Sequence, residues 1–433
     1  MSAWTRGTKA PVADELDVAD LVVSEGVMPP VSGRLVRLGP NPVGPVDEHY
    51  QWFGGTGMAH AIDFDGGSPT RFVNRWVRTP EVSEALGEPQ RFEPLDSDIA
   101  NTSAMFVAGE LLAMTETCAP YVLGQDLETV RREDFGAGVT EFTAHPHTDP
   151  ITGEVFAIGY GGNHDPACTV HRIDADGVLQ DQRRVELLGA RSIHDVAVTE
   201  RYVIVWDLPL EFDDDDPNLF PYAWNRDGAA RIGLVDRADL HRPVRWFDID
   251  PCWVFHPLNA HDTDDGVVVD VVRFDRIFDI DRTGPGDPYP PQLWRWELDL
   301  GGNTARQTLV DDRVQEFPRL DARRWSRPYR YGYTIELMSA AGGPSIIAHD
   351  LEGSETQSWS TERGRSLSEA IFVPESADAG ENEGWLLAID SDPEHSDLVA
   401  FDATAVAAGP IGRVRLPQRI PDGFHGDWIP TPD

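Results

Sequence analysis

The sequence predicts an all-β protein, and three features of the chain support this fold class. Short runs of apolar and β-branched residues recur along most of its length. Gly, Asp, Asn and Pro divide these runs, and helical periodicity is almost absent. Evenly spaced strands of this kind are typical of a β-sandwich, a barrel or a propeller. No Trp-Asp dipeptide repeats at a fixed interval, so these observations leave the three architectures open.

The predicted strands follow one another after an N-terminal arm. They cover residues 58–64, 71–77, 104–109, 111–116, 154–160, 202–208, 231–237, 266–274, 292–300, 345–351, 370–375 and 385–390. Each combines aliphatic, β-branched or aromatic residues and is bounded by turn residues. In addition, a hairpin is expected from two strands at residues 252–255 and 267–274, joined by a polar turn at residues 262–266.

The 433 residues exceed the usual size of one domain, yet nothing in the chain marks a boundary between domains. It has no Pro/Ser-rich linker, low-complexity tract or coiled-coil heptad. Propellers reach this length as one domain, because their blades close around one axis. We therefore predict an arm at residues 1–33 with at most one short helix, and a single domain at residues 34–433.

The charge of the chain excludes one class of partner. The formal net charge is -38, from 74 acidic and 36 basic residues, and Lys9 is the only lysine. Such a surface repels the phosphates of nucleic acid and anionic lipid headgroups, so nucleic-acid binding is excluded. Abundant acid with almost no lysine also suggests adaptation to strong salt, where screening limits the repulsion between like charges.

The cysteines and the N-terminus indicate a soluble protein of the cytoplasm. Cys118, Cys168 and Cys252 are an odd number without a Cys-x-x-Cys spacing, which fits a reducing compartment. The first residues carry acids early and lack the apolar core of a signal peptide. No apolar run approaches the roughly 20 residues that span a bilayer.

Four stretches each place a histidine at a turn or at the end of a predicted strand. These histidines are His145, His194, His256 and His425. One histidine beside an apolar run is more often structural than a ligand, but the fourfold repetition favours a metal site. Four imidazoles without a carboxylate suit a borderline divalent ion, and ligand type alone leaves Fe, Zn, Cu and Ni open.

These stretches belong to a longer series of motifs that resembles the carotenoid cleavage oxygenase family. The other motifs are RLGPNPVGP (37–45), HYQWFGGTGMAHAIDF (49–64), NRWVRT (74–79), ANTSAM (100–105), EFPRLDARRWSRPYRYGY (316–333), EAIFVPE (369–375) and HGDW (425–428). The resemblance implies a seven-bladed β-propeller, with loops and short helices forming a dome over a metal on its axis. Residues 211–225 and 281–292 are then expected as loops of the dome or rim.

The resemblance also implies a metal and the residues around it. Members of the family hold a non-haem Fe(II) with four histidines, which match His145, His194, His256 and His425. Three glutamates support the ligands in the family, and they match Glu116 for His194, Glu316 for His256 and Glu369 for His425. Thr102 matches a position that faces an open coordination site, although a threonine in a turn explains it equally well.

The reaction that the resemblance implies is insertion of both atoms of O2 across a conjugated C=C bond, which gives two carbonyl products. In the stilbene-cleaving branch a lysine beside the first supporting glutamate binds a phenolic hydroxyl, and here that position is Thr115. A carotenoid or apocarotenoid is therefore the preferred substrate. No hydrolase signature such as Gly-x-Ser-x-Gly or His-Glu-x-x-His occurs.

Several alternatives stay open at this point. They are an oxygenase for stilbenes or another phenylpropanoid, a relative that isomerises and hydrolyses a retinoid ester, and a propeller that only binds a ligand. No obligate protein partner is inferred. Substrate uptake by peripheral contact with a membrane is a further hypothesis, in which Leu219, Phe220, Pro221 and Tyr222 form an exposed apolar patch.

Overall fold

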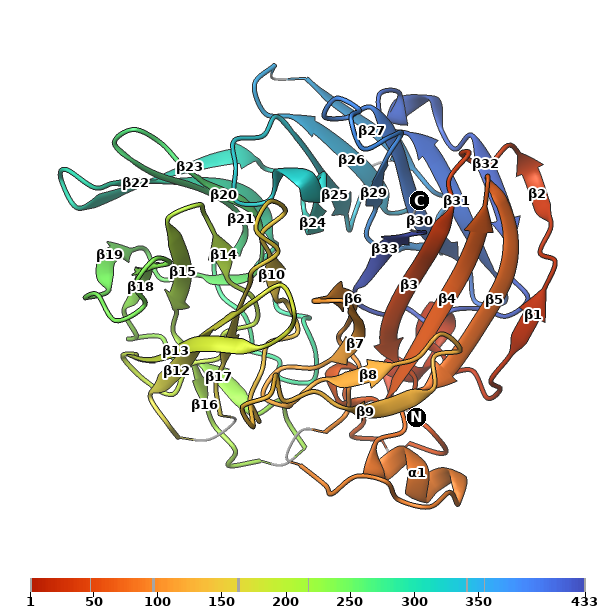
Figure 1. The fold of residues 1–433 in the computed structure, drawn as a ribbon, viewed down its shortest axis with the longest axis horizontal. Coiled ribbons are helices and arrows are strands. Elements are labelled where there is room, and N and C mark those ends of the chain that lie inside the picture. Colours follow the sequence, from red (N-terminus) through yellow and green to blue (C-terminus); the bar gives the residue numbers. More distant parts are fainter. Residues whose placement is uncertain are drawn as a thin grey trace.

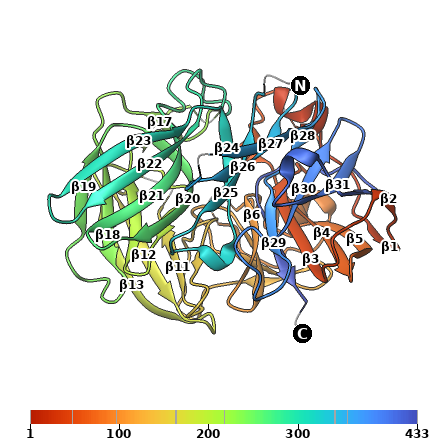
Figure 2. The same cartoon turned by 90° about the horizontal axis from the view of Figure 1, so that it is seen from above.

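The computed structural model describes residues 2–46, 48–95, 98–161, 164–216, 218–339, 342–353 and 355–431. Seven antiparallel sheets stand around one axis as the blades of a propeller, which confirms the predicted fold class (Figure 1). An additional two-stranded ribbon consists of β16 (Leu210–Phe212) and β17 (Tyr222–Trp224). Seen from the side, the ring is a thick disc, and the chain termini lie at opposite faces (Figure 2).

Five blades are continuous in sequence, apart from the ribbon inserted in the third of them. They consist of β6 (Ser103–Val107), β7 (Glu110–Met114), β8 (Tyr121–Leu123) and β9 (Thr129–Arg132); β10 (His147–Thr148), β11 (Val155–Gly159), β12 (Ala167–Ile173) and β13 (Leu179–Glu186); β14 (Ala197–Val198), β15 (Tyr202–Asp207), β18 (Ala230–Asp236) and β19 (Arg245–Ile249); β20 (Trp253–Asp262), β21 (Gly266–Phe274), β22 (Gln292–Asp299) and β23 (Thr304–Asp311); and β24 (Gln315–Arg319), β25 (Tyr331–Glu336), β26 (Ser345–Asp350) and β27 (Thr356–Ser360).

The other two blades join the two ends of the chain. One consists of β1 (Asp17–Ala19), β3 (Gly33–Pro40), β4 (Gly57–Asp65), β5 (Ser68–Trp76) and β33 (Gly426–Pro430). The other consists of β2 (Val23–Gly26), β28 (Ser366–Leu367), β29 (Ile371–Pro374), β30 (Gly384–Ser391), β31 (Ser396–Asp402) and β32 (Gly412–Arg415). Pairing of β3 with β33 and of β2 with β32 joins the N-terminal and C-terminal segments and so closes the ring.

The N-terminal arm differs from its prediction. Instead of at most one short helix, residues 1–33 contain the 3-10 helices η1 (Ala3–Thr5) and η2 (Gly7–Lys9) and the strands β1 and β2. The strands pair with β5 and β32, which are distant in sequence, so local pattern could not reveal them. A boundary after residue 33 stays a prediction.

Helices are few in the described part of the chain. The single α-helix, α1 (Pro80–Leu86), begins with Thr79, whose hydroxyl accepts the N–H of Val82, and has Pro80 in its first turn. Three further 3-10 helices are η3 (Trp52–Gly54), η4 (Ala322–Arg324) and η5 (Val406–Ala408). No described helix is long and apolar enough to cross a membrane. The three cysteines are buried and unpaired.

The strand that carries His256 departs from the predicted hairpin. Strand β20 continues beyond Phe255 to Asp262, so His256 lies within the strand rather than at its end. Two shifts of register flank Pro257, which has no N–H to donate to the neighbouring strand. The strand therefore tolerates proline by bulging, and the bulge occurs directly beside the histidine.

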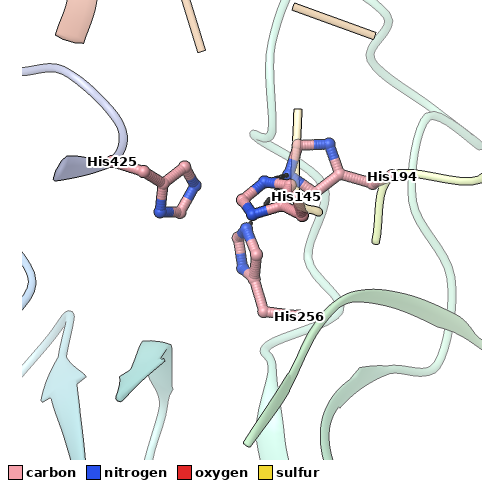
Figure 3. Close-up of side chains that lie close together, drawn as sticks. All are labelled: His145, His194, His256 and His425. Atoms are coloured by element: carbon pink, nitrogen blue, oxygen red, sulfur yellow. Dashed lines mark hydrogen bonds between the residues drawn. The ribbon is translucent and has the colours of Figure 1, made fainter. Parts of the chain in front are cut away.

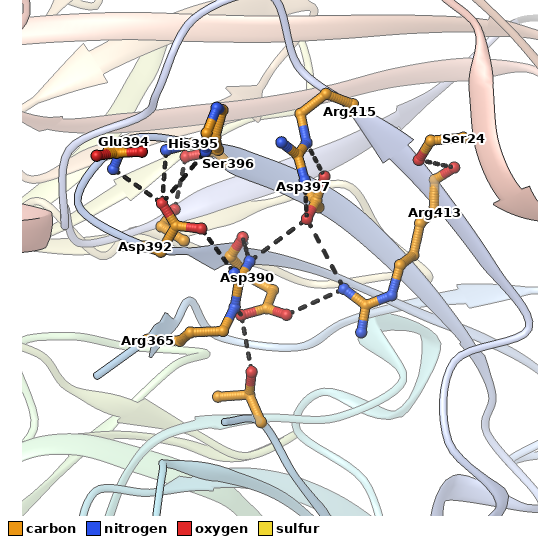
Figure 4. Close-up of polar contacts among 12 residues, drawn as sticks. Ser24, Arg365, Asp390, Asp392, Glu394, His395, Ser396, Asp397, Arg413 and Arg415 are labelled. Atoms are coloured by element: carbon orange, nitrogen blue, oxygen red, sulfur yellow. Dashed lines mark hydrogen bonds and ion pairs between the residues drawn. The ribbon is translucent and has the colours of Figure 1, made fainter. Parts of the chain in front are cut away.

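Buried charges hold the last blade together (Figure 4). Asp390 and Asp397 are 1% and 4% exposed, on β30 and β31. Arg365 Nε contacts Asp390 Oδ1 at 2.6 Å, and Arg413 Nη1 on β32 contacts Asp390 Oδ2 at 3.1 Å. Arg415 Nε contacts Asp397 Oδ1 at 2.5 Å. Each buried carboxylate thus faces guanidinium groups, which offset the cost of its burial.

Candidate metal centre

The four predicted histidines come from four blades, each lying within or shortly before the inner strand of its blade. His145 and His194 lie in the loops just before β10 and β14, and His425 directly precedes β33. With His256 on β20, they bring their rings together in one cluster (Figure 3). Each ring is held by backbone at the start or the bulge of an inner strand, where side chains aim at the axis.

The distances between the rings define a compact cluster of donors. His194 Nε2 lies 3.0 Å from His145 Nε2 and 3.0 Å from His256 Nε2. The ring centroid of His425 is 4.5 Å from that of His145 and 4.6 Å from that of His256. One nitrogen from each ring lies within 4.8 Å of the others, so the four could hold one metal ion.

Three glutamates support three of these histidines, in the pairs that the resemblance implied. His256 Nδ1 lies 2.7 Å from Glu316 Oε2, and His425 Nδ1 lies 3.0 Å from Glu369 Oε2. His194 Nδ1 contacts Glu116 Oε1. A carboxylate accepts the Nδ1–H, which fixes the tautomer and leaves an Nε2 lone pair for a metal.

The donor set fits a cation. With the proton of each supported ring on Nδ1, the Nε2 lone pairs of His194 and His256 face each other at 3.0 Å. Opposed lone pairs repel one another, and a divalent cation between them converts this repulsion into coordination. The imidazole set suits Fe, Zn, Cu or Ni by ligand type. The ligand roles themselves stay a proposal.

Among the described residues, no glutamate pairs with His145, and its surroundings differ from those of the other three histidines. Its Nδ1 is 3.9 Å from Asp195 Oδ2, while Asp195 Oδ1 lies 3.0 Å from the Nε2 of His147. The backbone N–H of His145 donates to Thr143 Oγ1 at 2.9 Å. His145 is therefore positioned mainly by its backbone and by a shared carboxylate.

Burial and neighbouring charges keep the rings of His145 and His425 neutral. Burial, and then the neighbouring imidazoles, holds the pKa of His145 well below its ordinary value. Burial also lowers the pKa of His425 to about 4, although Glu369 opposes this shift. Burial raises the pKa of Glu369, but Arg319 and His425 outweigh it and bring that pKa to about 2. Glu369 is thus a charged acceptor beside a neutral imidazole.

Thr102 lies beside two members of the centre. Its carbonyl oxygen accepts the backbone N–H of His425 at 3.1 Å, and its hydroxyl lies 3.3 Å from Glu116 Oε2. The hydroxyl also donates to Asn101 Oδ1 at 3.0 Å. The structure therefore brings Thr102 to the centre, while its predicted role at an open coordination site stays a prediction.

A cavity of about 970 Å³ opens onto one side of the histidines. Its wall is mainly apolar and aromatic and includes Phe53, Phe255 and Phe424. Thr102 and the imidazoles of His194, His256 and His425 also line it. Both predicted rim loops contribute to this wall, through residues 220–222 and 285–291. The volume of the cavity and the chemistry of its wall suit a large apolar ligand.

The proposed membrane patch at residues 219–222 is wrong in its placement. Phe220 packs inward, with its ring 4.5 Å from that of Phe278 and 5.5 Å from that of Phe53. Tyr222 is buried in the ribbon, and both side chains line the cavity. Sequence alone could not show this, because the acidic run beside these residues resembles a solvated loop.

A smaller cavity of about 200 Å³ reaches the histidines from the other side. Its lining is more polar and includes His147, Asp195, Arg319 and Asp427. His256 and His425 border both cavities, so the imidazole cluster is reached by a large apolar chamber and by a smaller, more polar one.

Sequence reasoning missed the residues that shape the large cavity. Phe255 and Phe424 directly precede two of the histidines, and that adjacency is a signal that could have identified them. Lys9 also lines the cavity, although it lies far from every histidine motif in sequence. Its only signal was that the chain contains no other lysine.

A seven-bladed propeller with four clustered imidazoles that could hold a metal ion, beside an apolar chamber, is consistent with an enzyme built on this fold. The model of one family, described as retinal pigment epithelial membrane protein, matches residues 9–430. The chain is 34% identical over 490 residues to a carotenoid cleavage oxygenase of Mycobacterium tuberculosis (strain CDC 1551 / Oshkosh), covering 99% of this chain and 97% of the relative. It therefore belongs to the carotenoid cleavage oxygenase family and is an oxygenase.

Two further similarities agree with this assignment. Carotenoid 9,10(9',10')-cleavage dioxygenase 1 of Arabidopsis thaliana is 30% identical over 487 residues, covering 98% of this chain and 89% of the relative. The crystal structure of Pseudomonas brassicacearum lignostilbene dioxygenase superposes with a TM-score of 0.89 at 27% identity, covering 100% of this chain and 99% of that one.

Proposed function

We propose that the protein is a non-haem Fe(II) dioxygenase that cleaves a conjugated C=C bond of a carotenoid or apocarotenoid with O2, giving two carbonyl products. One observation carries the proposal: the four-histidine centre opens directly into a large chamber whose wall is aromatic and apolar. Ferrous iron, when bound, supplies the redox chemistry that lets triplet dioxygen react with a closed-shell double bond.

The chain's own residues bind, orient and exclude water. His145, His194, His256 and His425 would hold the iron through Nε2, and the supporting glutamates keep three of those rings in one orientation. Phe255 and Phe424 lie beside the ligand rings, so a polyene that packs on them has its double bonds close to the centre. The apolar wall also keeps bulk water from the reacting bond.

A phenolic substrate is the second candidate, and one observation favours it. The Tyr222 hydroxyl is buried, has no hydrogen-bond partner among the described residues, and lines the same chamber. Tyr160 and Ser192 line the wall as well, with their hydroxyl oxygens 3.4 Å apart. These groups could bind the phenol of a stilbene or another phenylpropanoid, and the lignostilbene dioxygenase is structurally similar.

The other two alternatives are less favoured. A binding protein without activity would gain nothing from opposed imidazole lone pairs at the axis, since they destabilise the fold unless a cation is bound. A retinoid isomerohydrolase needs the same centre, and the mass of the product separates the two, because cleavage shortens the carbon chain.

Aerobic incubation of the Fe(II)-loaded protein in molar salt tests the proposal. The panel contains carotenoids, apocarotenoids and a hydroxystilbene, with visible absorbance and product mass as the readouts. We expect loss of the polyene band and two shorter carbonyl products that each carry one atom from ¹⁸O-labelled dioxygen. Consumption of the stilbene alone would favour the second candidate, and consumption of neither with iron bound would overturn both.

We also propose that the protein works in the cytoplasm and takes its substrate from a membrane by peripheral contact. Among the described residues, the large hydrophobic side chains that both line the chamber and are exposed are Leu337 and Met338, at 40% and 74%. We therefore assign the contact to them. Met338→Asp should weaken binding to neutral-lipid vesicles in high salt, whereas Phe220→Asp should not; the reverse result would refute this assignment.

A further inference from the structure

The chain's only lysine is held at the wall of the substrate chamber. Lys9 Nζ donates to Asp422 Oδ2 at 3.0 Å and lies 5.0 Å from the ring centroid of Trp52 and 5.9 Å from that of Trp4. The two indoles stack on each other with centroids 5.7 Å apart. All three side chains line the chamber. A protein that has almost eliminated lysine thus keeps one in an aromatic wall.

The ammonium is built in rather than loosely placed. Asp422 also accepts from Thr8 Oγ1 at 2.7 Å and from Ser366 Oγ at 2.5 Å, and the backbone N–H of Asp422 donates to the carbonyl of Thr8. Among the described residues, Nζ makes one hydrogen bond, so two of its three N–H groups remain for a ligand. The lysine is therefore a fixed donor in a chamber with few polar groups.

A continuous aromatic wall joins this lysine to the metal centre. The Trp52 ring lies 4.8 Å from the ring of Phe424, the residue before His425, and Phe53 lies 5.7 Å from Phe424. Asp422 itself is only three residues before His425 in sequence. A ligand that packs along these rings would have one part at the histidines and another at the ammonium.

We propose that Lys9 and Asp422 form a polar subsite that binds an oxygen atom on the end group of the substrate and so selects oxygenated substrates. Lys9 donates to that oxygen, which anchors the molecule at a set distance from the centre. Because Asp422 already neutralises the ammonium, the subsite takes a neutral hydroxyl or carbonyl rather than a carboxylate. This inference rests on the proposed function.

The chamber contains one competing cation among the described residues of its wall. Arg276 contacts Asp279 Oδ2 at 3.4 Å, lies over the ring of Tyr289 and is 43% exposed. Its greater exposure weakens any hydrogen bond it could give to a ligand, since water competes for the same donors. Arg276→Met is therefore the comparison variant for Lys9→Met.

Binding without turnover tests the subsite separately from the reaction. The full metal-loaded chain is titrated under nitrogen with an apocarotenal that carries a ring hydroxyl, with the same compound lacking the hydroxyl, and with the corresponding carboxylic acid. Quenching of tryptophan fluorescence reports the Kd. We expect the wild type and Arg276→Met to bind the hydroxylated compound about 10-fold more tightly than the unsubstituted one. Lys9→Met should abolish this preference, with Lys9→Arg retaining part of it.

Lys9→Met leaves Asp422 without its cation, so a second variant guards against a purely structural effect. The double variant Lys9→Met/Asp422→Asn removes both charges, and it should keep the affinity for the unsubstituted compound while lacking the preference. Equal loss for both compounds, or loss in Arg276→Met instead, would overturn the subsite. Tighter binding of the acid would overturn the choice of a neutral group. Absence of cleavage alone would refute the proposed function and leave the binding preference intact.

Discussion

The ring centre and the last blade both bury ionisable side chains, but they satisfy them in opposite ways. In the last blade, Asp390 and Asp397 face the guanidinium groups of Arg365, Arg413 and Arg415, so the network is complete within the protein. At the centre, four imidazoles direct like donor atoms at one another. A buried charge that is paired with an opposite charge is compatible with a stable fold. Buried lone pairs without a partner in the protein indicate that a bound ligand supplies the partner.

The largest expected effect is loss of activity when a histidine of the centre is removed. His256→Ala should abolish turnover, because it removes a donor from the centre and takes from Glu316 the imidazole whose Nδ1–H it accepts. His261→Ala, five residues along the same strand, should keep turnover near that of the wild type. The measurement is the rate of substrate loss, with circular dichroism to verify the fold. Near-normal turnover in His256→Ala would refute the ligand assignment.

A smaller effect is expected at a glutamate that accepts a hydrogen bond from one of the four histidines. Glu316→Gln keeps a carbonyl that can accept the Nδ1–H of His256 but removes the charge, so metal affinity or rate should fall roughly 10 to 100-fold. Glu110→Gln, at a half-exposed carboxylate on β7, is the matched control. The measurements are the metal content and the turnover of both variants. An unchanged Glu316→Gln would show that the supporting carboxylate does not tune the centre.

The last blade should respond in stability rather than in activity. Arg413→Met removes one of the two arginines at Asp390 and the contact with Glu25 of β2, which should lower the free energy of unfolding by about 1–3 kcal/mol. The midpoint of urea unfolding measures this, and Arg306→Met, at a 70% exposed arginine, is the control. If Arg413→Met lost turnover while its free energy of unfolding stayed that of the wild type, the distinction between the two regions would be wrong.

Much of the fold could be predicted from local pattern, and the exceptions have physical causes. The apolar runs identified many of the strands, because burial imposes their composition. Pattern could not reveal β1 and β2, whose partners β5 and β32 are distant in sequence. It also missed the extension of β20 past Pro257, since a bulge relieves the missing N–H only in the context of the folded sheet.

The candidate site could likewise be predicted only in part. The four histidines and three glutamates stood in recognisable motifs, and the structure brings all seven together. The loops at residues 211–225 and 281–292 were expected near the centre, but the individual side chains of the chamber wall could not be predicted, because the wall combines loops from several blades. Phe220 and Tyr222 therefore seemed exposed although they line the chamber, and nothing in the sequence placed Lys9 there.

The smallest expected effect concerns the surface as a whole. With 74 acidic against 36 basic residues, repulsion between carboxylates should destabilise the fold in dilute buffer, and screening should relieve it. The free energy of unfolding should rise with KCl concentration up to the molar range. Full stability at low salt would refute the adaptation to salt and would leave the two buried regions unaffected.

The most direct test of the metal centre is an anaerobic titration of the metal-free protein with Fe(II) in molar KCl, with the bound ion counted after gel filtration. If buried donors without a complement require an external cation, the wild type and His261→Ala should each bind a single ion per chain, and His256→Ala should bind none. Equal binding by all three proteins would contradict the account, because the four imidazoles would then not be the site.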